Sequence, residues 1–172
     1  WTGKNSFTEL NAAMNFHLRG LGSAPEEFDF KRYNSDGSYL YFRGDASHTH
    51  DLPGGFQVFL KAQGQLASAP LINNEQFAGG GLTTVRGYLE ATALGDNGIF
   101  GTVELRSPSL LRKLDGKDNE WRIYAFCEGG RLTLIDPLPE QIDSYDLLSV
   151  GFGTRLRLLN HFNASLDAGM PL

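Results

Sequence analysis

Hydrophobic and polar residues alternate along most of the chain, in segments of about ten residues separated by short turns. In the clearest segment, apolar side chains occupy every second position: Phe56, Val58, Leu60, Ala62 and Leu66. Polar side chains occupy positions between them: Gln57, Lys61, Gln63 and Gln65. Because successive side chains of a β-strand point to opposite faces, this pattern predicts a strand with one apolar and one polar face.

Seven segments of this kind occur, at residues 9–19, 38–50, 56–66, 99–106, 121–130, 148–158 and 162–167. Turn sequences such as Asn34-Ser-Asp-Gly37 and Leu52-Pro-Gly-Gly55 separate neighbouring segments. Residues 26–33 fit either a short helical turn or a loop, and residues 113–120 form a charged turn. Residues 136–144 fit a loop, with or without a helical turn. We predict an all-β fold in which the strands form an antiparallel up-and-down meander, with residues 1–172 as a single region.

The alternation fits two environments. A soluble sandwich buries the apolar face and hydrates the polar one, whereas a porin-like wall turns its apolar face to lipid and its polar face to an aqueous lumen. No apolar run approaches the ~18 residues of a membrane-spanning helix. A formal net charge of −5 makes a nucleic-acid partner unexpected. Seven strands leave two open edges, so we expect those edges to self-associate unless further strands cover them.

Sequence patterns of enzymes are missing. The chain has no Ser/His/Asp grouping in a recognisable context, no Cys/His metal spacing and no phosphate-binding loop that leads into a helix. His48 and His50 share one strand face, but two histidines near a turn do not define a metal site. The single cysteine, Cys127, has apolar neighbours and fits an inert packing residue. We therefore expect no catalytic activity, no cofactor and no metal.

A glycine-rich stretch interrupts the alternation between the third and fourth segments. It begins with Gly79, Gly80 and Gly81 and closes with Arg86 and Gly87, which predicts a loop of specified shape that carries a charge.

A possible partner for Arg86 lies on the fifth segment, where Phe126, Glu128 and Gly130 project to the same side. Docking would pair the Arg86 guanidinium with Glu128 and stack it on Phe126, and Gly130 would leave room above the carboxylate. In the alternative, Arg86 is solvent-exposed and Glu128 pairs with a neighbour such as Arg155.

Several motifs around this loop occur in a characteristic order. They are Leu52-Pro-Gly-Gly-Phe56, Asn74-Glu-Gln-Phe77, Gly79-Gly-Gly-Leu-Thr-Thr-Val-Arg-Gly-Tyr88, Gly95-Asp-Asn-Gly98 and Phe126-Cys-Glu-Gly-Gly130. Together they resemble the hemolysin activation/secretion proteins, the outer-membrane transporters of two-partner secretion. The loop motif of that family corresponds here to Gly79, Gly80, Val85, Arg86, Gly87 and Tyr88. The strand motif of that superfamily usually has Asp where this chain has Glu128.

The resemblance implies a sixteen-strand transmembrane β-barrel preceded by POTRA domains, of which this chain would be the C-terminal part without its final strand. The loop at residues 67–96 would fold back into the lumen, where Arg86 would meet Glu128. The implied function is passive export of an unfolded hemolysin or adhesin, encoded nearby, across the outer membrane of a Gram-negative bacterium. The implied partners are this exoprotein and the lipid bilayer. Two alternatives are a barrel-assembly or surface-antigen protein of the same superfamily and a soluble β-sandwich binding module.

Overall fold

A computed structural model of the chain describes residues 1–19, 25–35, 37–111, 119–159 and 161–172. Most of the charged turn predicted at 113–120 lies outside the described residues. Seven long strands make up the main sheet: β1 (Ser6–His17), β2 (Tyr39–Asp51), β3 (Gln57–Ala67), β6 (Asn97–Arg106), β7 (Glu120–Thr133), β8 (Ser144–Leu158) and β9 (Phe162–Pro171).

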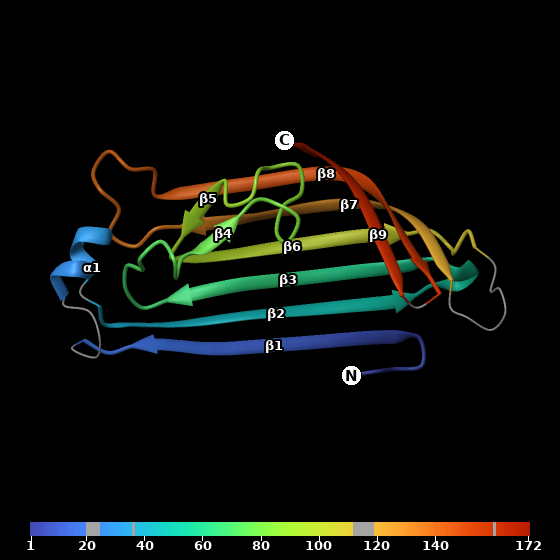
Figure 1. Cartoon of the computed structure of the whole chain (residues 1–172), viewed down its shortest axis with the longest axis horizontal. Helices are drawn as coiled ribbons and strands as arrows, with labels where there is room; N and C mark the ends of the chain where they lie inside the picture. Colours follow the sequence, from blue (N-terminus) through green and yellow to red (C-terminus); the bar gives the residue numbers. More distant parts are fainter. Residues whose placement is uncertain (20–24, 36, 112–118, 160) are drawn as a thin grey trace.

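The order of the strands in the sheet follows their order in the chain, and each pairs antiparallel with the next. The strands run side by side, and β9 crosses obliquely over one end of the sheet (Figure 1). The prediction of an all-β antiparallel meander is therefore confirmed. The sheet is not closed, because β1 and β9 are its two edges.

Two segments that the sequence left open now have definite structures. The first contains the helix α1 (Pro25–Lys31), whose first turn is acidic and whose last turn carries Lys31, as the helix dipole favours. In the second, residues 134–143 contain no helix, and β8 begins at Ser144, four residues before the predicted start. The hairpin extends further because Thr133 pairs with Ser144 and the Leu134 amide donates to the Asp143 carbonyl.

The two faces of the sheet differ in what covers them. The loop between β3 and β6 lies on one face, which we call the loop face, and we call the other the apolar face. Large hydrophobic side chains on the apolar face are exposed, among them Leu10, Leu66, Ile99, Phe152 and Leu166. Exposed hydrophobic surface of this extent is rare on a soluble monomer.

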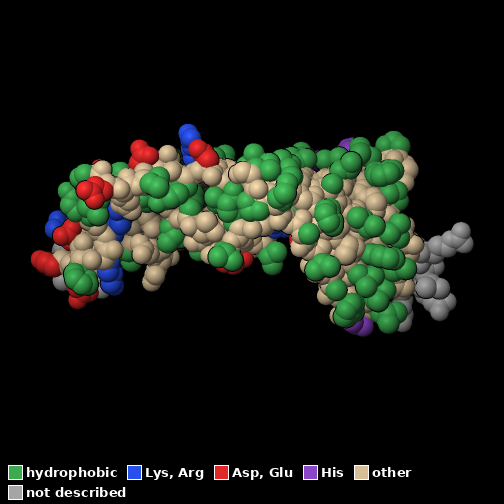
Figure 2. All heavy atoms as spheres, turned by 90° about the horizontal axis from the view of Figure 1, so that it is seen from above, with side chains coloured by type: hydrophobic (Ala, Val, Ile, Leu, Met, Phe, Trp, Pro, Cys, Tyr) green, Lys and Arg blue, Asp and Glu red, His purple; other side chains and the backbone are tan. Residues whose placement is uncertain are grey.

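Cys127 also lies on the apolar face and is exposed, so the expectation that it packs inside the chain is wrong. In a view from above, hydrophobic side chains are spread along the surface, whereas charged side chains gather at the end that carries α1 (Figure 2). Among the described residues, no helix is long and apolar enough to cross a membrane.

Candidate functional site

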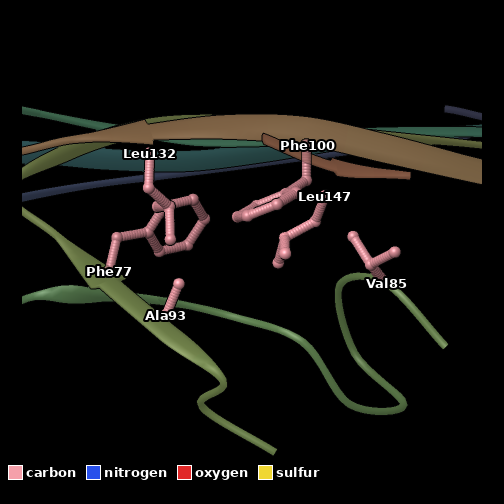
Figure 3. Close-up of a cluster of buried hydrophobic side chains, with 6 residues drawn as sticks. All are labelled: Phe77, Val85, Ala93, Phe100, Leu132 and Leu147. Atoms are coloured by element: carbon pink, nitrogen blue, oxygen red, sulfur yellow. The ribbon is translucent and has the colours of Figure 1, made fainter. Parts of the chain in front are cut away.

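The loop at residues 68–96 has its own small framework. Its strands β4 (Phe77–Gly79) and β5 (Ala93–Gly95) pair antiparallel. Their side chains meet those of the long strands in a buried hydrophobic cluster, in which three residues come from the loop and three from the sheet (Figure 3). These are Phe77, Val85 and Ala93 against Phe100, Leu132 and Leu147. The loop is thereby packed onto the sheet.

Glycine allows the tip of the loop to approach the sheet closely. Gly87 has φ +97°, a conformation that other residues rarely adopt, and a Cβ there would lie 2.9 Å from the carbonyl of Gly169 on β9. Val85 is fully buried on one side of Arg86. On the other, the Tyr88 hydroxyl donates to the Leu148 and Leu172 carbonyls at 3.3 and 3.4 Å.

Arg86 and Glu128 are in direct contact. The Arg86 Nε and Nη2 atoms donate to Glu128 Oε1 at 3.0 and 2.6 Å, and the Arg86 backbone amide donates to Oε2 at 2.7 Å. Thr102 Oγ1 donates to the same Oε1 at 3.2 Å. Arg86 is 6% exposed and Glu128 3%. The carboxylate therefore fixes both the side chain and the backbone of the loop at this point.

Two further carboxylates, which the sequence did not single out, complete the site. Arg86 Nη2 donates to Glu104 Oε1 at 2.8 Å, and Nη1 donates to Asp167 Oδ1 at 2.6 Å. Glu104 also accepts two hydrogen bonds from Arg106, and Asp167 accepts one from the Tyr124 hydroxyl. The alternation in the sequence places both acids on the polar faces of their strands. It does not reveal the pairing register between strands that brings these acids to Arg86. One guanidinium thus connects β6, β7 and β9.

Aromatic rings complete the surroundings of the guanidinium. Its carbon lies 3.6 Å from the centroid of the Phe126 ring and 5.8 Å from that of Tyr124. Gly130 has a different role from the one expected. A Cβ at this position would collide with the Ile99 carbonyl and the Phe100 ring. Gly130 therefore makes room for a core aromatic residue, and not for Arg86.

The electrostatics of the site favour a permanently charged arginine. Arg86 lies on the loop, outside the strands. Burial by itself lowers the pKa of its guanidinium, but hydrogen bonds and charge from Glu128, Asp167 and Glu104 outweigh burial and raise the pKa. Arg86 and Arg106 carry two positive charges against three carboxylates, so most of the negative charge of this interior site is compensated and one unit remains. Such a buried, multiply hydrogen-bonded arginine fixes position and performs no bond chemistry.

Another buried carboxylate, that of Asp96, holds the two ends of the loop, which we call its root, against the sheet. Asp96 is fully buried and accepts hydrogen bonds from the Leu71 amide at 2.9 Å, the Ile135 amide at 2.7 Å and Gln76 Nε2 at 3.0 Å. Its second oxygen forms a longer contact of 3.4 Å with Arg32, just beyond α1. In the sequence, Asp96 stands in the segment Asp-Asn-Gly, which is typical of a turn and does not indicate this role, so the role was missed.

Comparisons with known proteins agree with this architecture. Residues 3–156 match the family described as haemolysin secretion/activation protein ShlB/FhaC/HecB. Among solved structures, CdiB from Escherichia coli is similar in fold, with a TM-score of 0.73 and 22% sequence identity. The match covers 99% of this chain and 31% of the CdiB chain, so the chain spans less than a third of that protein. No curated protein matches the chain.

The family match covers well over half of the chain, and it favours neither the barrel-assembly protein nor the soluble sandwich module. The family comprises outer-membrane β-barrel transporters of two-partner secretion in Gram-negative bacteria, and no enzymatic activity is known for it. The predicted resemblance is confirmed: this chain belongs to the haemolysin secretion/activation (ShlB/FhaC/HecB) family.

Proposed function

We propose that the complete protein forms an outer-membrane pore that exports an unfolded hemolysin or adhesin, and that the loop at 67–96 lies in the lumen of this pore. The loop face would line the lumen and the apolar face would contact lipid. The observation that carries the proposal is the anchoring of Arg86 by three carboxylates on the loop face, opposite the exposed hydrophobic face.

The geometry supports a defined role for each residue of the loop motif. Arg86 holds the loop against the wall, Glu128 receives both its backbone and its side chain, and Phe126 supplies a flat surface beneath the guanidinium. Gly79, Gly80 and Gly87 permit close approach of the loop backbone, while Val85 and Tyr88 pack on either side of Arg86. Such a loop narrows the lumen of the pore and holds the lumen in one conformation when no exoprotein is being exported.

Expression of the full-length protein together with the secreted protein encoded beside it tests the proposal. We expect the exoprotein to reach the medium only when both are present and to remain in the periplasm when the transporter is deleted. Secretion that is independent of the transporter contradicts the proposal, as does retention of the exoprotein despite an inserted transporter.

A further inference from the structure

A cleft rich in arginine is lined by residues of β3, β6, β7, β8 and β9. The ends of β3 and β6 that contribute to it lie at the end of the sheet opposite α1 (Figure 1). Its volume is about 240 Å³. Four arginines, one carboxylate and one phenol account for its ionisable lining: Arg106, Arg122, Arg155, Arg157, Glu120 and Tyr124. The chain contains ten arginines in all, so four of the ten gather at this one cleft. We call this feature the arginine cleft.

The arginines of the cleft differ in how fully they are neutralised. Arg106 forms two hydrogen bonds with Glu104, at 2.9 and 2.7 Å. Arg122 bonds to Glu120 and to the carbonyls of Gly55 and Ser107. These two side chains are 12% and 16% exposed and are held by the wall.

Arg155 and Arg157 have much weaker partners. Arg157 meets Glu120 at 3.2 Å, but that carboxylate is already engaged by Arg122, and the Arg157 side chain is 48% exposed. Arg155 is exposed and lies over the Tyr124 ring at 5.2 Å. Among the described residues, no carboxylate forms an ion pair with Arg155. The lining therefore carries four positive charges against one negative charge, and two of its arginines, Arg155 and Arg157, are exposed.

The surroundings make this surplus charge unusual. The chain as a whole has a net charge of −5, so the basic cleft does not follow from overall composition. Contacts also connect the cleft with the Arg86 site, because Arg106 shares Glu104 with Arg86 and Tyr124 shares Asp167 with it. A polypeptide that moved along the loop face would pass the exposed guanidinium groups of Arg155 and Arg157 close to the Arg86 site.

We propose that the arginine cleft binds carboxylate groups of an acidic polypeptide segment. Arginine forks match carboxylates in a bidentate manner, and two adjacent forks suit side chains closely spaced along one extended chain. A rim of Gln57, Asn163 and Ser165 offers hydrogen-bonding groups to the peptide backbone. The identity of the segment as part of the exported chain rests on the proposed function, whereas the binding itself does not.

Direct binding tests the inference without any secretion assay, so its failure is distinguishable from failure of the proposed function. The full-length protein in detergent is titrated with fluorescein-labelled hexaglutamate. The Arg155→Gln/Arg157→Gln double variant should bind at least about tenfold more weakly, which corresponds to about 1.4 kcal/mol. Arg131→Gln is the matched control, because Arg131 is an exposed arginine on the apolar face and should bind as the wild type does.

Three further comparisons test which chemical groups the arginine cleft recognises. The Arg155→Lys/Arg157→Lys variant keeps both charges but loses the planar forks, and we expect affinity between those of the wild type and the Gln variant. Labelled hexalysine should not bind the cleft. Equal hexaglutamate affinity in the wild type and the Gln variant would overturn the proposal. So would displacement of hexaglutamate by sulfate as effectively as by unlabelled hexaglutamate at equal ionic strength, because the cleft would then bind any anion.

Discussion

Replacement of Glu128 by glutamine tests how firmly the loop is held. The wild-type carboxylate accepts from the Arg86 side chain through Oε1 and from the Arg86 amide through Oε2. Glutamine has nearly the same shape but only one acceptor oxygen. Whichever way the amide group lies, its NH₂ faces an N–H donor of Arg86, so one charge-assisted hydrogen bond is replaced by a donor–donor contact.

The cost follows from these contacts. Loss of one hydrogen bond to a charged group costs about 1.5–3 kcal/mol, and the missing negative charge adds to this. Glu104 and Asp167 remain to pair with Arg86, so the total stays near the lower end of the about 3–5 kcal/mol typical of a broken buried ion pair. We therefore expect the loop to open locally about 2–4 kcal/mol more easily than in the wild type. Its amides should then exchange about 30- to 700-fold faster.

Hydrogen exchange of the full-length protein, followed by mass spectrometry of peptides from residues 79–88, measures this opening. The control is Asp146→Asn, which weakens the exposed Arg131–Asp146 pair and should change exchange of the loop very little. Unchanged protection of residues 79–88 in Glu128→Gln, in a protein whose strands remain protected, would refute the assignment of Glu128 as the receptor of the loop.

Two other substitutions probe the loop at its tip and at its root. Gly87→Ala should cost about 1–3 kcal/mol in loop docking, because φ is +97° and the new Cβ would collide with Gly169. Faster exchange of the Arg86 amide measures this cost. The control is Gly101→Ala, whose Cβ would make only an ordinary contact of 3.9 Å with the Lys61 carbonyl and should have little effect. Asp96→Asn should loosen the root of the loop by about 3 kcal/mol, because an amide group cannot accept from all of its donors. Limited proteolysis near residues 68–76 should then speed up, whereas Asp136→Asn, on an exposed hydrogen bond, should leave the rate unchanged. Unaltered cleavage in Asp96→Asn would show that Asp96 does not hold the root.

The main sheet was predictable because each strand carries its own signal. Alternation between apolar and polar residues places Phe100, Thr102 and Glu104 on one face of β6 and Ile99 and Val103 on the other, without knowledge of the neighbouring strands. The same logic brings Phe126 and Glu128 to one face of β7. The residues alone left two alternatives for Arg86, docking on Glu128 or exposure to solvent, and the family resemblance favoured docking.

The convergence of three carboxylates on Arg86 was not predictable, because it depends on register between strands. Pairing of Thr102 with Glu128 places Glu104 two residues along the same face. Asp167 reaches the site because it pairs with Gly153, which in turn pairs with Tyr124 on β7. Asp96 was missed for a related reason. Its four hydrogen-bond donors come from segments up to 64 residues away, whereas its local sequence, Asp-Asn-Gly, is that of an ordinary turn.

The central claim is that Arg86 must anchor the loop for export to proceed, and the amount of exoprotein secreted per inserted transporter tests it most directly. Wild-type protein, Arg86→Lys and Arg86→Ala are compared at equal surface abundance. We predict that secretion falls from wild type to Arg86→Lys and further to Arg86→Ala. Lysine keeps the charge but lacks the planar fork that contacts all three carboxylates. Alanine leaves Glu128 and Asp167 without their cation, and only Glu104 keeps one, from Arg106. Wild-type secretion by Arg86→Ala would contradict the account.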